Sequence, residues 1–372
     1  MKVLSLVPYT IFPAKVGGQK GIALFNEYLA KECDLTCVTI KNNDPQFAKG
    51  YKVLNILGNS SLRYINFFYF FTLRRIIKQE GISHLILEHP YYAWLGILLK
   101  WFCGIKLVIH SHNIESSRWQ SLGKWWWKIL WYYERMAHRA ADYNFFIQDD
   151  DRNYALNSYR LTASKCSTIT YGIEWPDAPS RSEKQICREK IATLHQINKQ
   201  EKIFLFNGAL DYKPNYDALM TILNVINPIW LKHKDFHYRI IICGRKLPES
   251  LEELKDYKNQ NILYAGFVDD ITVYFKGADV FLNPIADGGG IKTKLVETIG
   301  YSTPAVSTKN GSIGVGDEAG ELLHVVPDND WNAFAAAAIR ISEKSYPQTP
   351  ESFYQKFYWG NIAKKAANFI QS

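Results

Sequence analysis

The sequence lacks the signatures of several common protein classes. Its six cysteines include no CxxC pair, and their scatter through apolar segments favours reduced thiols in a cytoplasmic protein. Lys100, Gly104 and Lys106 interrupt the longest apolar region, residues 91–109. We therefore expect a helix and a buried strand there rather than a membrane span. The first apolar run is too short and begins too early for a signal peptide, so we expect a cytoplasmic location.

Motifs of other nucleotide-binding classes are also missing. The first glycines, in LSLVPYTIFPAKVGG, come too late for the GxGxxG of a dinucleotide-dependent oxidoreductase, and there is no Walker loop. No RNA- or DNA-binding motif is present, so we expect no nucleic-acid partner. The formal net charge of +8 suits nucleotide phosphates, nucleic acid or an anionic membrane, without choosing among them.

The sequence does contain short apolar runs that alternate with helical patterns. Continuous apolar runs are typical of parallel strands that are covered on both faces, and the alternation predicts doubly wound α/β sheets. The expected strands are 2–7, 34–40, 84–89, 106–111 and 141–147, then 202–208, 238–244, 261–268, 279–284 and 303–308. The expected helices include 19–32, 64–80, 215–232, 291–301 and 331–345.

The alternation breaks at residues 170–185, which hold prolines and polar residues. We place the domain boundary there, with an N-terminal Rossmann-like domain over 1–172 and a second one over 173–355. Ligands of such sheets bind at the carboxyl ends of the strands, so a cleft between the two halves is the expected site.

Residues 283–297 read NPIADGGGIKTKLVE, with three glycines between a strand and a helix. Glycines let backbone N–H groups approach an anion, and the helix start adds unpaired N–H donors. Lys292 and Lys294 add mobile cations, and Glu297 shares a helix face with Lys294. This pattern suits a nucleoside diphosphate and its ribose, although a glycine-rich surface loop is the alternative.

Three further strand ends carry glycine and polar residues, in FNGALDYKPN, IICGRK and AGFVDD. With these, the second half resembles the donor domain of family 4 glycosyltransferases of GT-B fold. FNGALDYKPNYDAL, IICGRKLPE, YAGFVDDI and ADVFLNPIADGGGIKTKLVETIGYSTPAVSTKNGSIG carry the resemblance over residues 202–316. The first half supports it with GG at 17–18, HNIE at 112–115 and YGIE at 171–174.

The resemblance implies two doubly wound Rossmann-like domains facing a central cleft, with residues 356–372 as a helix that crosses back to the N-terminal domain. It also implies a role for each residue that matches the family motifs. Gly17, Gly18, Gly208, Gly289 and Gly290 would bring backbone close to the diphosphate or sugar, and Lys294 would support them. Lys213 or Arg245 would neutralise the leaving diphosphate. Phe267 and Val268 would present backbone groups to the base, and Glu297 would bind the ribose.

One position departs from the family pattern. Eight residues before Glu297 the family's E-x7-E motif has an acid, whereas this chain has Gly289, and Asp287 is the nearest carboxylate. The group that touches the hydroxyls of the donor sugar is therefore open. The usual arginine and lysine of the first donor loop are reduced to Lys213.

The segment KLVIHSHNIE (106–115) predicts a buried strand that ends in polar residues. His112 matches the family's strand-end histidine, which would orient the sugar or stabilise charge, and His110 is the alternative. Either ring could instead be a core or capping histidine. Glu115 and Arg118 could contact the acceptor, or serve as a helix cap and a surface ion pair.

The segment QDDDR (148–152) resembles an Asp-x-Asp metal site, but it follows a strand and opens a helix, so N-capping explains it more simply. No other group of acids, histidines or cysteines has metal-ligand spacing. We therefore expect neither a metal nor another cofactor, and cationic side chains would take the metal's role.

The segment GKWWWKILWYYERMAHR (123–139) mixes aromatic and basic residues. Such a segment suits a membrane interface, with FFYFF (67–71) as a second aromatic run, or the core packing of an unusually aromatic helix. The first reading gives a peripheral protein on the cytoplasmic face of the inner membrane with a lipid-linked acceptor.

By resemblance, the expected activity is retaining transfer of a sugar from a nucleoside diphosphate sugar to an acceptor hydroxyl, in bacterial surface polysaccharide or glycolipid synthesis. The alternatives are a nucleotide-sugar epimerase of the same fold and a non-catalytic nucleotide-sugar-binding protein.

Overall fold

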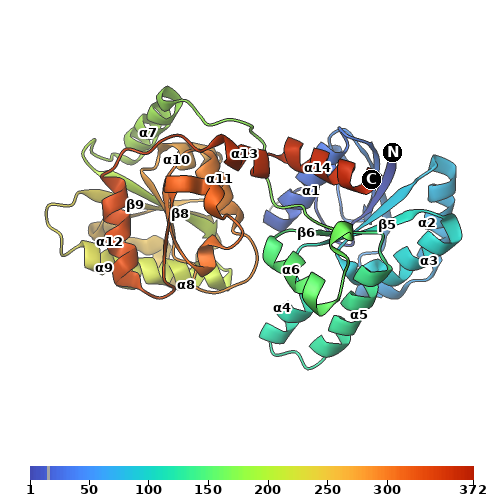
Figure 1. The fold of residues 1–372 in the computed structure, drawn as a ribbon. Coiled ribbons are helices and arrows are strands. Elements are labelled where there is room, and N and C mark those ends of the chain that lie inside the picture. The colour runs from blue at the N-terminus through green and yellow to red at the C-terminus, as the bar shows by residue number, and fades with distance from the viewer. Residues whose placement is uncertain (15–16) are drawn as a thin grey trace. The chain divides into compact units, whose positions relative to one another are not determined.

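The chain forms two compact units in the computed structural model, which describes residues 1–14 and 17–372 (Figure 1). Unit 1 contains Met1–Glu174 and Phe357–Ser372, and unit 2 contains Trp175–Lys356. The sequence analysis placed these boundaries after residues 172 and 355. The C-terminal segment therefore leaves unit 2 and packs with the N-terminal half of the chain.

Unit 1 is built on a seven-stranded parallel sheet in the order β3-β2-β1-β4-β5-β6-β7. Its strands are β1 (Lys2–Leu6), β2 (Asp34–Ile40), β3 (Lys52–Leu57), β4 (His84–Glu88), β5 (Lys106–Ser111), β6 (Tyr143–Phe146) and β7 (Cys166–Thr168). The predicted strands correspond to β1, β2, β4, β5 and β6. The sequence analysis missed the edge strands β3, which is only partly buried, and β7, which has three residues.

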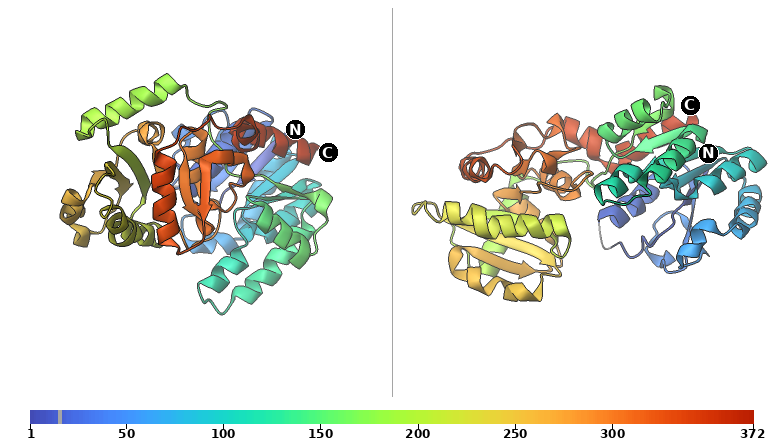
Figure 2. Two further views of the ribbon diagram at one scale, coloured as in Figure 1. Left: turned by 60° about the vertical axis from the view of Figure 1, so that its left-hand side comes forward. Right: turned by 90° about the horizontal axis from the view of Figure 1, so that it is seen from below.

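Helices cover both faces of this sheet (Figure 2). They are α1 (Gly17–Leu29), α2 (Phe68–Glu80), α3 (Ala93–Cys103), α4 (Glu115–Ser121), α5 (Trp127–Ala140), α6 (Asp149–Ser158) and α14 (Trp359–Gln371). The C-terminal α14 packs on α1, where the rings of Phe25 and Trp359 lie 6.4 Å apart. A separate apolar core joins α2, α3 and α5 to the sheet.

Unit 2 contains a six-stranded parallel sheet in the order β10-β9-β8-β11-β12-β13. Its strands are β8 (Lys202–Ala209), β9 (Tyr238–Arg245), β10 (Ile262–Gly266), β11 (Val280–Asn283), β12 (Ala305–Thr308) and β13 (Leu323–Val326). Its helices are α7 (Arg181–His195), α8 (Lys213–Thr221), α9 (Asn227–Trp230), α10 (Ile271–Gly277), α11 (Thr293–Gly300) and α12 (Trp331–Ser342), and α13 (Glu351–Phe357) ends at the boundary.

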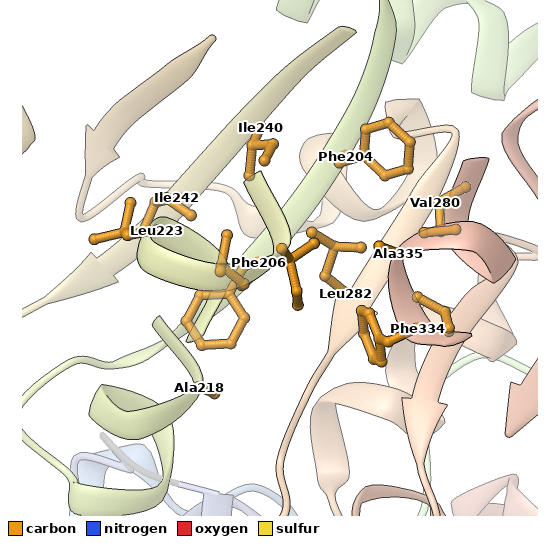
Figure 3. Close-up of a cluster of buried hydrophobic side chains, with 14 of the residues drawn as sticks. Phe204, Phe206, Ala218, Leu223, Ile240, Ile242, Val280, Leu282, Phe334 and Ala335 are labelled. Atoms are coloured by element: carbon orange, nitrogen blue, oxygen red, sulfur yellow. The ribbon is translucent and has the colours of Figure 1, made fainter. Parts of the chain in front are cut away.

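The core of unit 2 lies between the sheet and the layer of α8, α9 and α12 (Figure 3). Phe204 and Phe206 of β8 and Phe334 of α12 are almost fully buried in it. The single helix predicted over 215–232 is interrupted by a π-helical turn at Ile222–Ile226, next to Pro228. Proline has no N–H to donate, so the regular α-helical hydrogen bonds cannot continue through it.

Because the strands of each sheet are parallel, their carboxyl ends lie along one edge of that sheet, and most of the candidate residues follow those ends. In the described part of the chain, no helix combines the length and the apolar character that a bilayer crossing needs.

Candidate functional site

The glycine-rich loop of unit 2 is held in shape by a lysine. Gly288 and Gly290 have positive φ angles of 92° and 77°, which glycine adopts at little cost. The Lys292 ammonium donates to the carbonyl oxygens of Gly288 (2.9 Å) and Gly290 (2.8 Å). Because N–H and C=O point in opposite directions in a trans peptide, carbonyls turned to the lysine direct their amides away from it. The loop can therefore present N–H groups to an anion.

Lys292 differs from the mobile cation that the sequence predicted. Burial lowers the pKa of its ammonium to about 8, against the opposing charge of Asp287. The helix α11 begins at Thr293, with Lys292 at its N-cap, two residues later than expected. Asp287 accepts a hydrogen bond from the Gly288 amide at 2.7 Å, so its carboxylate lies at the start of the loop.

Lys294 is fixed below the loop rather than mobile. Its ammonium donates to the Asn207 carbonyl (2.5 Å) and the Asn215 side chain (3.0 Å). Burial lowers the pKa of Lys294 to about 8, and Glu297, one turn further along α11, opposes this shift. An anion near Lys294 would raise that pKa again, because opposite charge stabilises the ammonium.

Gly208 makes this arrangement sterically feasible. A Cβ atom there would lie 2.8 Å from both the Lys294 Nζ and the Asn215 Nδ2. At Gly244, on the neighbouring strand, a Cβ atom would lie 2.2 Å from the Gly208 carbonyl oxygen. The structure therefore brings the predicted Gly208 and Lys294 into contact, and it adds Asn215 as the residue that joins them.

The other predicted residues of unit 2 surround this centre less tightly. Lys213 is exposed and donates to Asp217 at 2.5 Å. Asp217, with a smaller contribution from Asp287, raises the pKa of the Lys213 ammonium. Arg245 ends β9 and is half-buried, whereas Phe267 is 75% exposed and Val268 is half-buried. A cavity of about 290 Å³ opens beside the glycine loop, with Pro214, Ala286 and Asp287 in its wall.

In unit 1, the carboxyl ends of β4 and β5 bring Glu88, His110 and His112 together. Glu88 and His110 are direct neighbours in the β4–β5 register. The Glu88 Oε2 lies 2.6 Å from His112 Nε2 and 3.1 Å from His110 Nδ1. Burial alone would raise the pKa of Glu88, but the two imidazoles hold it well below its usual range.

The two histidines differ in access to solvent. The side chain of His110 is 2% exposed, whereas that of His112 is 16% exposed. Burial and the neighbouring His110 lower the pKa of His112 to about 4, so its ring is neutral at pH 7. Of the two alternatives, His112 is therefore the ring that a ligand can reach.

A second carboxylate–imidazole pair lies beside the first. His89 stacks on His112 with a centroid separation of 4.6 Å, and its Nδ1 lies 3.3 Å from Glu115 Oε1. Burial would raise the pKa of Glu115, yet His89, Tyr91 and Arg118 hold it at about 2. Glu115 is thus a buried acid beside His89. The ion pair that the sequence offered as one alternative is also present, because Arg118 Nη1 lies 3.3 Å from Glu115 Oε2, although only the arginine is exposed.

The glycines of the first half occupy the start of a helix. Gly17 and Gly18 open α1, and a Cβ atom at Gly18 would meet nothing within 4 Å. Residues 15 and 16, which precede them, lie outside the described residues.

The predicted capping role of QDDDR needs correction. The helix α6 does begin there, but its N-cap is Gln148, which makes no side-chain cap hydrogen bond. The three aspartates lie in the first turn, where negative charge stabilises a helix. Asp149 accepts from Thr168, and burial raises the pKa of Asp151 to about 6.

Among the described residues, the group whose ligand atoms could hold a metal ion is Glu88, His110 and His112. The sequence analysis missed it because 22 residues separate Glu88 from His110. The only local signal is an acid and a histidine at the end of the apolar run HLILEH. The short contacts inside the group are those of hydrogen bonds to a buried carboxylate, which explain it without an ion.

The aromatic segment 123–139 is partly packed and partly exposed. Trp131 and Tyr133 donate hydrogen bonds to Tyr154 and to the Tyr91 carbonyl. In contrast, Trp125 is 82% exposed and Tyr132 is 65% exposed. Neither of the two readings from the sequence therefore describes the whole segment.

Two family models match the chain, one in each unit. The model described as Glycosyltransferase Family 4 matches residues 17–174, and the one described as Glycosyl transferases group 1 matches residues 201–344. A curated relative, an uncharacterized 44.6 kDa protein in the cps region of Klebsiella pneumoniae, is 29% identical over 58% of this chain and 53% of its own length. The chain thus spans about half the length of the curated relative that it matches.

Solved glycosyltransferase structures share the fold over the whole chain. A glycosyltransferase from Rickettsia africae has a TM-score of 0.71 at 14% identity, covering 100% of this chain and 97% of its own. WaaG, a glycosyltransferase involved in lipopolysaccharide biosynthesis, has a TM-score of 0.67 at 14% identity, with full coverage of both chains. Anabaena Alr3699/HepE, in complex with UDP-glucose, has a TM-score of 0.66 at 15% identity, covering 100% of this chain and 99% of its own. With two parallel α/β sheets and these matches, the chain belongs to the group 1, family 4 glycosyltransferases and is an enzyme of GT-B fold.

Proposed function

We propose that this glycosyltransferase moves a sugar from a nucleoside diphosphate sugar to an acceptor hydroxyl, with retention of the anomeric configuration. The product would be a bacterial surface polysaccharide or glycolipid. Two observations carry the proposal. Lys294 lies against Gly208 and donates a hydrogen bond to Asn215, and Lys292 binds the carbonyl groups of the nearby glycine loop. A preformed group of amides and buried ammonium groups suits a diphosphate better than it suits a neutral ligand.

The same residues would serve the chemistry. Departure of the nucleoside diphosphate leaves negative charge on the phosphates and an oxocarbenium-like sugar. Lys294 is already desolvated, so its attraction to that charge is stronger than it would be in water. Lys213 or Arg245 would add a second cation, and Glu297 would accept hydrogen bonds from the ribose. We propose that these cations replace a metal ion.

Solved structures of similar proteins with bound nucleotides support a nucleoside diphosphate sugar as the donor. Anabaena Alr3699/HepE is solved with UDP and with UDP-glucose. WaaG and the galactosyltransferase WaaB are described with lipopolysaccharide, and the Klebsiella relative with a cps region. We infer a uridine diphosphate sugar as the first donor to try and a cell-surface glycan as the product class.

Calorimetry with UDP, GDP, ADP and NAD, without added metal, tests the donor site. We expect one nucleoside diphosphate to bind, with an affinity that falls about 10- to 100-fold in Glu297→Ala because charged hydrogen bonds are lost. The matched control is Glu343→Ala, which removes an exposed acid at the end of α12. Binding of NAD alone, or unchanged binding by Glu297→Ala, would contradict the proposal.

Product analysis then separates the transferase from an epimerase. A transferase consumes the donor productively only when an acceptor is supplied, whereas an epimerase converts the donor alone. Retention is read from the anomeric configuration of the isolated product.

We also propose that unit 1 rests on an anionic bilayer. Large apolar side chains of α2, α3 and the α4–α5 region are exposed, namely Phe68, Phe71, Trp101, Phe102, Trp125, Ile129 and Tyr132. Exposed basic residues lie among them, including Lys78, Lys124, Lys128 and Arg139. Aromatic residues favour the membrane interface, and each Lys or Arg near an anionic surface adds about 1 kcal/mol.

Vesicle co-sedimentation tests this surface. We expect binding to vesicles with anionic lipid and weaker binding to neutral ones, with loss in Trp125→Ser/Phe102→Ser. The control is Leu194→Ser, an exposed apolar residue at the end of α7 in unit 2. Equal binding by both variants, or no preference for anionic lipid, would exclude this surface.

A further inference from the structure

The Glu88 carboxylate is fully buried, and two imidazoles supply its contacts. Its side chain has 0% exposure, and His112 Nε2 and His110 Nδ1 approach the same oxygen at 2.6 Å and 3.1 Å. An ionised carboxylate only accepts hydrogen bonds. Each of these two ring nitrogens must therefore carry the proton and donate it to Glu88.

This assignment fixes the other nitrogen of His112. A neutral imidazole has one protonated nitrogen and one acceptor nitrogen. Because Nε2 donates to Glu88, the Nδ1 of His112 is left as the acceptor. The Nε2 of the buried His110 has no hydrogen-bond partner among the described residues.

Neighbouring rings fix the orientation of His112. His110 and His89 lie against it with centroid separations of 4.5 Å and 4.6 Å. His89 Nδ1 in turn lies 3.3 Å from Glu115 Oε1, and His89 has a positive φ of 71°, which a non-glycine residue rarely adopts. The carboxylate thus sets the position of the ring edge, and the two rings restrict its rotation.

We propose that Glu88 is a positioning residue that holds His112 in the Nε2–H tautomer, so that Nδ1 accepts a hydrogen bond from a substrate hydroxyl. The group that His112 recognises is then the hydroxyl of a sugar, either the transferred one or the acceptor. A phosphate oxygen does not match this neutral tautomer, because two acceptors cannot pair. This inference rests on the proposed function for its substrate and on unit 1 alone for its geometry.

The tautomer can be measured without any substrate. The nine histidines are labelled with ¹⁵N, and the His112 signals are assigned by their loss in His112→Ala. We expect a protonated Nε2 coupled to its proton, and an Nδ1 with the shift of an unprotonated nitrogen. A wild-type His112 that is protonated on Nδ1, or that exchanges between tautomers, overturns the proposal even if Glu88→Gln does not fold.

Glu88→Gln provides the second arm. An amide keeps one accepting oxygen but loses the negative charge, and its NH₂ group replaces the second carboxylate oxygen, which lies 3.3 Å from His110 Nδ1. Glutamine therefore holds the two ring N–H groups more weakly than the carboxylate does. We expect the His112 spectrum to change and kcat to fall roughly 100-fold, in the range of a misplaced acid–base or hydrogen-bonding group. The nucleotide affinity of unit 2 and the donor KM should change little.

The matched control is Glu80→Gln, the same chemical change in a carboxylate at the end of α2. Glu80 pairs with Lys52 and Thr36, which lie at the starts of β3 and β2, the opposite edge of the same sheet. It should leave the His112 spectrum and kcat unchanged. An unchanged kcat in Glu88→Gln, or an equal loss of kcat and nucleotide affinity, would overturn the positioning role.

Two other outcomes are distinguishable. Stoichiometric Zn²⁺ binding that Glu88→Gln abolishes would replace the hydrogen bonds by metal ligation and overturn the proposal. If wild type shows the expected tautomer but neither binds a nucleotide nor transfers a sugar, the proposed function fails and, with it, the hydroxyl as the partner of Nδ1.

Discussion

The carboxyl edges of the two sheets share a parallel topology but use opposite chemistry. In unit 1 the edge holds buried acids and imidazoles, with Glu88 between His110 and His112. In unit 2 it holds glycines and buried ammonium groups, with Lys292 and Lys294 bound to backbone carbonyls. Each edge is preorganised by contacts inside its own unit. The same parallel topology can therefore carry an edge of buried carboxylates and imidazoles or an edge of glycines and buried ammonium groups, depending on which side chains follow its strands.

The largest effect should come from filling the space that Gly208 leaves. In Gly208→Val the new side chain meets Lys294 and Asn215, so we expect a loss of about 1–3 kcal/mol in unfolding free energy, typical of overpacking. Nucleotide binding should become undetectable, because Lys294 is displaced. Calorimetry and denaturant unfolding measure both. Gly289→Ala should leave stability unchanged, because no heavy atom lies within 4 Å of the added Cβ.

A selective loss of turnover should follow at the other edge. In His112→Ala we expect kcat to fall about 100-fold while nucleotide affinity stays unchanged, because the imidazole acts in unit 1. Steady-state kinetics and calorimetry together give the answer. An equal loss of nucleotide affinity would contradict separate roles for the two sheet edges. Unchanged turnover would show that His112 has only a structural role.

Acid should destabilise unit 1 before unit 2. Burial lowers the pKa of His138 to about 4, against a hydrogen bond to Asn144, and its unfolded value is about 6.5. The unfolded state binds more protons between these values, so stability is present above pH 6.5 and is lost as pH falls towards 4. At pH 5 the loss from His138 is about 2 kcal/mol, and His112 acts in the same direction.

Alkali should stabilise unit 2, with a slope of stability against pH that has the same sign as in unit 1 but lies in a higher pH window. The pKa values of Lys292 and Lys294 are lowered to about 8 in the folded chain, so the unfolded state binds more protons above that pH. Their contribution makes unit 2 more stable as pH rises from 8 to 9. Hydrogen–deuterium exchange, corrected for the intrinsic pH dependence and resolved by unit, measures both slopes. Equal responses of the two units would contradict the contrast.

The smallest effect concerns the shape of the glycine loop. In Lys292→Met the bonds to Gly288 and Gly290 are lost, and we expect about a 10-fold weaker nucleotide affinity with little change in stability, as for the loss of about one hydrogen bond. Lys232→Met, an exposed lysine after α9, is the control. If calorimetry shows equal affinity for both variants, the loop holds its shape without the lysine.

Much of the fold could be read from local patterns. Continuous apolar runs predicted the central strands of both sheets, because strands covered on both faces must be apolar throughout. The edge strands β3, β7 and β13 were not predicted, because edges need less apolar surface or fewer residues. Glycines and lysines at strand ends also identified the residues around Gly208 and Lys294, since their chemistry is visible in the residue types.

What the sequence by itself determined is therefore the α/β class, the division into two units and the residue types at each strand end. Only the tertiary structure decided which of those residues meet. Glu88 faces His110 because the β4–β5 register places them side by side, and Lys294 reaches Asn207 and Asn215 across 87 and 79 residues. The physical reason is that burial and partner distance set both the charge and the orientation of a side chain, and neither is encoded in local spacing.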